Sequence, residues 1–201
     1  MPDTSTGRVR VAVLISGAGS NMAALIDAAD RVDAPFEVVL VLSNRPEAGG
    51  LALAETRGVA SAVVDHAPFG KDRAAHERAI QTVLEAHGVE VVALAGYMRL
   101  LTPFLVGQWA GRMLNIHPSL LPKHPGLDTH ARALAAGDTE AGCTVHLVTD
   151  GVDEGPLLAQ ASVAIQPDDT PASLARRVLA AEHQLYPTAL ADLCRRQIRS
   201  S

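Results

Sequence analysis

Aromatic residues are scarce in this chain: its 201 residues include one Trp, two Tyr and three Phe, or 3% of the total. Proteins that bind single-stranded nucleic acid stack bases on aromatic side chains, so this composition argues against such a partner. Basic residues are outnumbered as well, with 17 Lys and Arg against 22 Asp and Glu and a net charge of −5. Because nucleic acids select for a basic surface, we expect no nucleic acid among the partners.

Cysteines are few and long apolar runs are absent. The two cysteines, Cys143 and Cys194, lack metal-ligand spacing and do not make a disulfide framework. We therefore expect a reduced, cytoplasmic location. The apolar run at residues 11–15 is too short for a signal peptide or a membrane span, so no membrane association is expected. The polar residues 1–8 should form a flexible leader.

What the sequence does contain is a regular alternation of strand and helix patterns, with 48% hydrophobic residues. Each predicted strand is a short, continuous apolar run, as in strands buried on both faces of a parallel sheet. The predicted strands are residues 9–15, 36–42, 60–64 and 89–95, and the predicted helices are residues 22–29, 48–57 and 71–86. This order predicts right-handed crossovers and a parallel sheet.

The second half departs from that order. Strands at residues 143–148 and 157–165 are too close for a helical crossover, so we expect them to be antiparallel. A strand beginning at Met113 and helices at residues 103–110, 129–136 and 172–196 complete the prediction, with Pro187 kinking or splitting the last helix. The expected fold is α/β: one Rossmann-like, three-layer domain over residues 1–201, with helices on both faces of a mostly parallel, twisted sheet and an antiparallel C-terminal part.

The loop at residues 16–21, SGAGSN, joins the first strand to a helix N-terminus. Its two glycines let the backbone approach an anion, and the free N–H groups of the helix favour a phosphate. It lacks the third glycine of a dinucleotide-binding fingerprint and the Gly-Lys-Ser/Thr of a Walker loop. A phosphate on a substrate fits this loop better than a dinucleotide, and a plain tight turn is the alternative.

The segment MLNIHPSLLPKHPG, residues 113–126, carries the strongest chemical signal. By the two-residue period of a strand, Asn115 and His117 share one face, and Pro118 should end the strand. Asp153, in an acidic loop at residues 149–156, can favour the protonated imidazole. An Asn and a protonated His aimed at one point would stabilise an oxyanion in acyl transfer, with the carboxylate moving a proton.

Two alternatives compete with this interpretation of the segment. The first is a polar strand end followed by a turn-rich loop. The second is a zinc site, which the scattered histidines do not favour because they lack zinc-ligand spacing; we expect no metal. His146 is expected to be a strand residue near the site. No serine or cysteine lies in a nucleophile elbow, so direct transfer is favoured over a covalent acyl-enzyme.

Arg99 follows the fourth predicted strand in the run YMRLL, residues 97–101. Mixed apolar and cationic character suits a flat heteroaromatic ligand with an acidic tail. Arg73 lies at a helix start, where a cation is unfavourable for the helix dipole, and this hints at a ligand carboxylate. Both arginines are equally compatible with ordinary surface positions.

Together these motifs resemble the phosphoribosylglycinamide formyltransferases of purine synthesis, a branch of the folate-dependent formyltransferases. The resemblance covers nearly the whole chain: VAVLISGAGSN, LSNRPEAGGL, LAGYMRLLTP, LNIHPSLLPKHPG, VTDGVDEGP and AEHQLYP. It implies transfer of the formyl group of 10-formyltetrahydrofolate, the co-substrate, to the glycinamide amine of 5′-phosphoribosylglycinamide by direct attack through a tetrahedral intermediate. It implies small-molecule substrates, a monomer or homodimer, and a cis bond before Pro122.

The resemblance also implies roles for individual residues. The catalytic positions are Asn115, His117 and Asp153. The phosphoribosylglycinamide positions are Gly19, Ser20, Asn21 and Glu182. The folate positions are Arg73, Met98, Arg99, Leu100, Leu101, Asn115, Val148 and Asp150.

Two other enzyme activities and one non-catalytic function remain open at this point. A tRNA formyltransferase would carry a further basic domain, and a formyltetrahydrofolate hydrolase would carry an N-terminal regulatory domain; we expect neither in 201 residues. A non-catalytic nucleotide-binding protein would explain the glycine loop, but it would not explain Asn115, His117 and Asp153 together.

Overall fold

The computed structural model describes residues 7–200. Seven strands form one sheet in the order β3-β2-β1-β4-β5-β6-β7. Strands β3 to β5 in this order pair in parallel, and the β5–β6 and β6–β7 pairs are antiparallel. The strands are β1 (Val9–Ile15), β2 (Phe36–Ser43), β3 (Ser61–Val63), β4 (Val91–Leu94), β5 (Met113–His117), β6 (Glu140–Leu147) and β7 (Leu157–Ala164).

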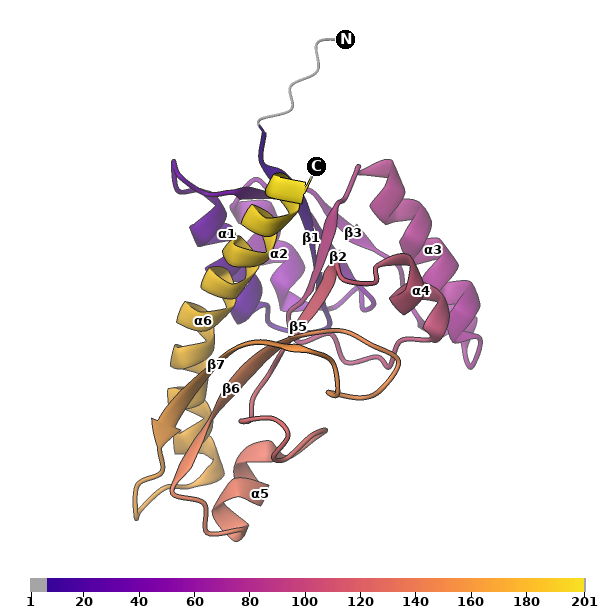
Figure 1. Ribbon diagram of the computed structural model, residues 1–201. Helices are drawn as coiled ribbons and strands as arrows, with labels where there is room; N and C mark the ends of the chain where they lie inside the picture. Colours follow the sequence, from indigo (N-terminus) through magenta and orange to yellow (C-terminus); the bar gives the residue numbers. More distant parts are fainter. Residues whose placement is uncertain (1–6, 201) are drawn as a thin grey trace.

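Helices cover both faces of the sheet, as Figure 1 shows. Helices α1, α2 and α6 pack on one face, and α3 and α4 pack on the other. The helices are α1 (Ser20–Ala29), α2 (Gly49–Thr56), α3 (Arg73–Ala86), α4 (Pro103–Gln108), α5 (Thr129–Ala135) and α6 (Pro171–Ser200), with a 3₁₀ turn, η1, at Ala67–Phe69. The expected three-layer α/β architecture and its antiparallel C-terminal part are confirmed.

The central strand β1 shows why its sequence is almost entirely apolar. Val11, Val13 and Ile15 point into the core under α1, α2 and α6. Ala12 and Leu14 point into the core under α3 and α4. Because successive side chains of a strand point to opposite faces, a strand covered on both faces needs apolar residues at every position.

Several predicted element boundaries were wrong by a few residues. Helix α1 begins at Ser20, two residues early, because Gly19 at φ 77° makes the turn out of β1. Helix α3 begins at Arg73, two residues late, since the Asp72 side chain accepts from the Ala75 N–H and caps it. The Leu121–Pro122 peptide is cis, as expected.

Of the two effects predicted for Pro187, a kink or a split of the last helix, the split does not occur. Helix α6 runs without a break from Pro171 to Ser200 with Pro187 inside it. A proline removes one N–H of the helical ladder, and the packing of the flanking turns outweighs that loss. Tyr186, Leu190 and Cys194 on this helix are fully buried against the sheet. No helix within residues 7–200 is both long and apolar enough to cross a membrane.

Candidate active site

The carboxyl end of β5 carries the two polar residues expected there. Leu114 and Ile116 point into the core under α1 and α6, so Asn115 and His117 lie on the opposite face. His117 is only 6% exposed. This strand lies between β4 and β6, so both polar side chains stand inside the sheet, away from its edge.

Asp153 meets His117 from the loop between β6 and β7. One of its carboxylate oxygens, Oδ2, lies 3.3 Å from Nδ1 of His117 and accepts the Gly126 N–H at 2.9 Å. The other, Oδ1, lies 3.5 Å from Nε2 of His146. Burial raises the pKa of Asp153, but the hydrogen bonds from His146 and Gly126 and the charge of His117 outweigh it, so the pKa lies below its usual value.

Both ring nitrogens of His117 face acceptors. Nδ1 faces the Asp153 carboxylate, and Nε2 lies 3.0 Å from the backbone carbonyl oxygen of His124. A neutral imidazole has one N–H to donate and an imidazolium has two. The doubly protonated ring therefore satisfies both partners, and this is the form that can stabilise an oxyanion.

His146 completes the cluster, and its place in it was not predicted. It lies directly opposite Asn115 in the β5–β6 pair, with Nε2 3.3 Å from Nδ2 of Asn115. Its Nδ1 is 3.0 Å from the Leu147 carbonyl, so this nitrogen donates. Nε2 of His146 thus lies within reach of both Asn115 and Asp153, and it either accepts from the Asn115 amide or donates to the Asp153 carboxylate. Only the strand register creates this contact, so no local sequence pattern could have shown it.

A cavity of about 140 Å³ opens beside Asn115 and Asp153. Of the residues predicted to contact folate, Arg99, Leu100, Leu101, Asn115, Val148 and Asp150 line it. Met98, which is 65% exposed, and the exposed Arg73 are not among its lining residues. Thr149, Gly151 and Val152, in the loop of residues 148–153 that the resemblance placed against folate, also line it, as does His146, which was expected near the site; Leu94 and Tyr97 are the lining residues not predicted.

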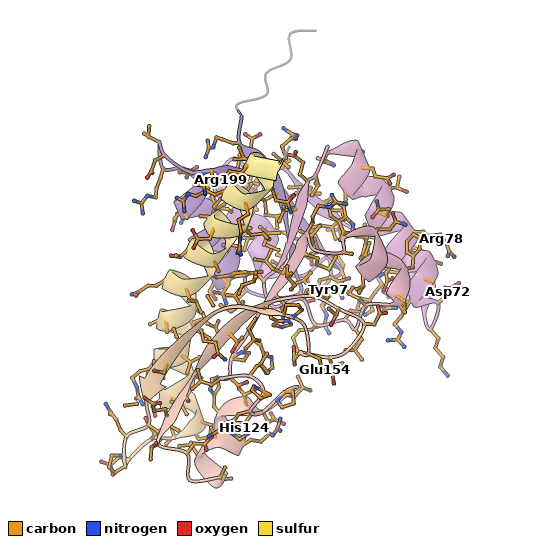
Figure 2. The ribbon with its side chains drawn as sticks, in the orientation of Figure 1. Asp72, Arg78, Tyr97, His124, Glu154 and Arg199 are labelled. Atoms are coloured by element: carbon orange, nitrogen blue, oxygen red, sulfur yellow. The ribbon has the colours of Figure 1, made fainter. Side chains whose placement is uncertain are left out.

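Two polar atoms of the cavity wall are buried without a hydrogen-bond partner in the part of the chain that the structure describes. They are Nε of Arg99 and the hydroxyl of Tyr97, which is labelled in Figure 2. Buried polar groups in native proteins are normally paired with protein, water or ligand. Tyr97 and Arg99 thus bring unsatisfied polar groups to a wall that also contains the apolar side chains of Leu101 and Val148.

The glycine loop ends where α1 begins, at the carboxyl end of β1. Gly19 adopts φ 77°, and a Cβ added there would lie 2.9 Å from the Gly50 Cα. Asn21 donates through Nδ2 to Oε2 of Glu182 at 2.6 Å, which brings α6 to the loop. Glu182 is 6% exposed, and burial raises the pKa of its carboxyl, although the Asn21 hydrogen bond opposes the shift.

A buried hydrogen-bond relay joins the glycine loop to the cavity wall. The Ser16 hydroxyl donates to Oδ1 of Asn44 at 2.6 Å and accepts the Met98 N–H at 2.8 Å. The ends of β1, β2 and β4 are thereby held in one arrangement.

Within residues 7–200 no group of three or more His, Cys, Asp or Glu side chains is placed to hold a metal ion.

A sequence profile of the formyl transferase family matches residues 9–190. The chain belongs to the formyl transferase family. Among solved structures, phosphoribosylglycinamide formyltransferase from Brucella melitensis is 53% identical, with a TM-score of 0.89 over 93% of this chain and 96% of that one. Glycinamide ribonucleotide transformylase 1 from Symbiobacterium toebii is 44% identical, with a TM-score of 0.91 over 94% and 89%.

Curated relatives of this formyl transferase are of two lengths. Phosphoribosylglycinamide formyltransferase from Escherichia coli K12 is 43% identical over 182 residues, which are 90% of this chain and 85% of that protein. Trifunctional purine biosynthetic protein adenosine-3 from Drosophila melanogaster is 49% identical over 193 residues, which are 94% of this chain and 14% of that protein. The chain thus spans about a seventh of the length of the trifunctional relative.

Proposed function

We propose that this formyl transferase moves the formyl group of 10-formyltetrahydrofolate to the glycinamide amine of 5′-phosphoribosylglycinamide, in purine synthesis. The observation that carries the proposal is the meeting of Asn115, His117 and Asp153 beside the cavity. The glycine loop stands at the carboxyl end of β1, two strands away in the same sheet. Relatives that bear the name of this activity support it.

The site residues divide the chemistry among them. Both N–H groups of a protonated His117 are directed at Asp153 and the His124 carbonyl, so the ring would stabilise the negative charge that develops on the formyl oxygen through its positive charge, while the Asn115 amide would donate to that oxygen. Asp153 would keep His117 protonated and take part in moving the proton of the attacking amine. His146 would hold the Asn115 amide and the Asp153 carboxylate at their present separation.

The cavity fits the folate co-substrate. It combines apolar walls with the unpartnered Nε of Arg99 and hydroxyl of Tyr97, as a flat heteroaromatic ring with polar edges requires. When bound, the co-substrate supplies the electrophilic formyl carbon. Met98 and Arg73 would contact parts of the folate outside the cavity, with Arg73 near its glutamate tail.

The glycine loop would hold the ribonucleotide phosphate on the free N–H groups at the start of α1. Gly19, Ser20 and Asn21 supply this surface, and Glu182 would contact the glycinamide end. A cytoplasmic location and a monomeric or homodimeric state remain predictions of the sequence.

The test is the conversion of phosphoribosylglycinamide and 10-formyltetrahydrofolate to the formylated ribonucleotide by purified protein. His117→Ala should lower kcat by at least ~10²-fold, because it removes the positive charge beside the developing oxyanion. His87→Ala is the matched control: His87 follows the last turn of α3, and its backbone carbonyl accepts from Arg10 near the start of β1, at the opposite end of the strands from the site, so kcat should not change.

Two outcomes would contradict the proposal. Full turnover by the His117→Ala variant would remove the assigned role of the imidazole. Hydrolysis of 10-formyltetrahydrofolate at full rate without the ribonucleotide would identify a hydrolase instead.

A further inference from the structure

Asp138, which follows α5, fastens the loop of residues 118–128. Its Oδ2 lies 2.8 Å from Nε2 of His124, and its Oδ1 lies 2.9 Å from Nζ of Lys123. Both carboxylate oxygens thus hold the same loop. The hydrogen bond from His124, followed by that from Lys123, lowers the pKa of Asp138, so the carboxylate is charged at neutral pH.

Of the two ion pairs of Asp138, the one with His124 is less exposed to solvent. The Lys123 side chain is 62% exposed, whereas that of His124 is 16% exposed. Exposed ion pairs contribute little because water screens them. Of the two Asp138 contacts, the one with His124 therefore constrains the loop more, and Figure 2 shows His124 next to α5.

His124 needs such a constraint because its backbone is strained. It adopts φ 53°, a left-handed conformation that side chains other than glycine rarely take. This conformation is coupled to a specific contact, since the His124 carbonyl accepts from Nε2 of His117 at 3.0 Å. Residues in strained conformations persist only when surrounding contacts hold them.

The hydrogen bond from Nε2 of His117 to the His124 carbonyl fixes the orientation of the His117 imidazole. With Nε2 bound to the His124 carbonyl, the Nδ1 edge faces Asp153, which lines the cavity. Loss of the carbonyl would allow the ring to rotate, and the positively charged ring would leave its place against Asp153 beside the cavity.

We propose that Asp138 is a positioning residue for His117, acting through the side chain and then the carbonyl of His124. The inference rests on the proposed formyl transfer, in which the orientation of this ring decides the rate. It predicts a loss in kcat with little change in substrate affinity, because Asp138 lies outside the cavity and the glycine loop.

Kinetics of four variants test it. Asp138→Asn and His124→Ala should each lower kcat by about 10- to 100-fold, the scale of a misplaced catalytic group, with KM values for both substrates within about twofold. The double variant should lose no more than either single one, because both act through one contact. Lys123→Ala, which removes the exposed arm, should lower kcat by less than about threefold.

Asp169→Asn is the matched control. Like Asp138, Asp169 uses both carboxylate oxygens in ion pairs, in this case with Arg177. It precedes α6 and does not line the cavity. Its kcat should stay at the wild-type value. Multiplicative losses in the double variant, or an equal loss in Asp169→Asn, would overturn the proposal.

Imidazole ¹H–¹⁵N spectra give a readout that needs no turnover. The Nε2 proton of His117 should be protected from exchange with water and give a signal in the wild type and in Asp169→Asn. This signal should disappear in Asp138→Asn and His124→Ala. An unchanged signal in both variants would reject the positioning role even if formyl transfer occurs. Conversely, an enzyme without this activity that still shows the expected signals would refute only the proposed function.

Discussion

At the scale of single residues, Gly19 is the position in the glycine loop that tolerates no side chain. Its φ of 77° is unfavourable for any L-residue with a Cβ, and that Cβ would press on the Gly50 backbone at 2.9 Å. Gly17, two residues earlier, has no atom within 4 Å of its added Cβ. The backbone therefore requires glycine at position 19, whereas position 17 has room for a side chain.

Gly19→Ala should lower the free energy of unfolding by at least about 1–2 kcal/mol, the cost of a left-handed alanine, with the Gly50 contact adding to it. Gly17→Ala should change it by less than about 0.5 kcal/mol. Urea denaturation of both variants measures the difference. Equal stabilities would show that the loop relaxes around the new methyl group.

Predictions for single residues succeeded where they depended on the two-residue repeat of a strand. Asn115 and His117 were predicted on one face because a strand alternates, and the structure places them there. His146 and the His124 carbonyl were not predicted as partners, because strand register and a folded loop bring them in. Local spacing contains neither.

At the scale of elements, α6 is fastened to the sheet by one buried hydroxyl. The Tyr186 hydroxyl lies 2.8 Å from the Leu94 carbonyl and 3.2 Å from the Leu114 carbonyl, at β4 and β5. It donates its single proton to these groups from a fully buried position. The long helix is thereby tied to the two strands that lead into the site.

Tyr186→Phe should lower the free energy of unfolding by about 1–3 kcal/mol, because it leaves buried carbonyls without a donor. Tyr97→Phe is the control, since the Tyr97 hydroxyl has no hydrogen-bond partner within residues 7–200. That change should be neutral within about 0.5 kcal/mol. Thermal or urea unfolding compares them, and a neutral Tyr186→Phe would contradict the tie between helix and sheet.

Element prediction was accurate for type and order, but the split of the last helix at Pro187 does not occur. Hydrophobic periods show which segments are strands and helices, and the short β6–β7 connection shows their antiparallel pairing. The rule that proline breaks a helix is local. In α6 the apolar contacts on both sides of Pro187 keep the helix continuous, and only the packed structure shows them.

At the scale of the whole molecule, Asp153 connects segments far apart in the chain. Its carboxylate meets His117 of β5, His146 of β6 and the Gly126 N–H of the intervening loop. Its pKa lies below the usual value because these contacts outweigh burial. Such a group stabilises the fold above its unfolded pKa, and this stabilisation is lost as the pH falls through the folded pKa.

Asp153→Asn should therefore be less stable than the wild type at pH 7. The difference should narrow as the pH falls below about 4, the ordinary aspartate range, because the wild type then loses the charge that the variant lacks. Urea titrations across pH 7 to 3 measure it. A difference that stays constant over this range would show that the charge of Asp153 contributes nothing to the fold.

The sequence by itself determined the α/β class, the strand and helix order, the glycine loop before α1 and the placement of Asn115 and His117 on one face of β5. These properties depend on neighbours within one turn or one strand, where steric and hydrophobic rules act locally. The sequence also placed Asp153 with that pair, but the tertiary structure alone decided the contacts of the Asn115 amide with His146, of Asp153 with the Gly126 N–H and of His117 with the His124 carbonyl. Those contacts depend on strand register and loop closure, which are set by packing across the whole sheet.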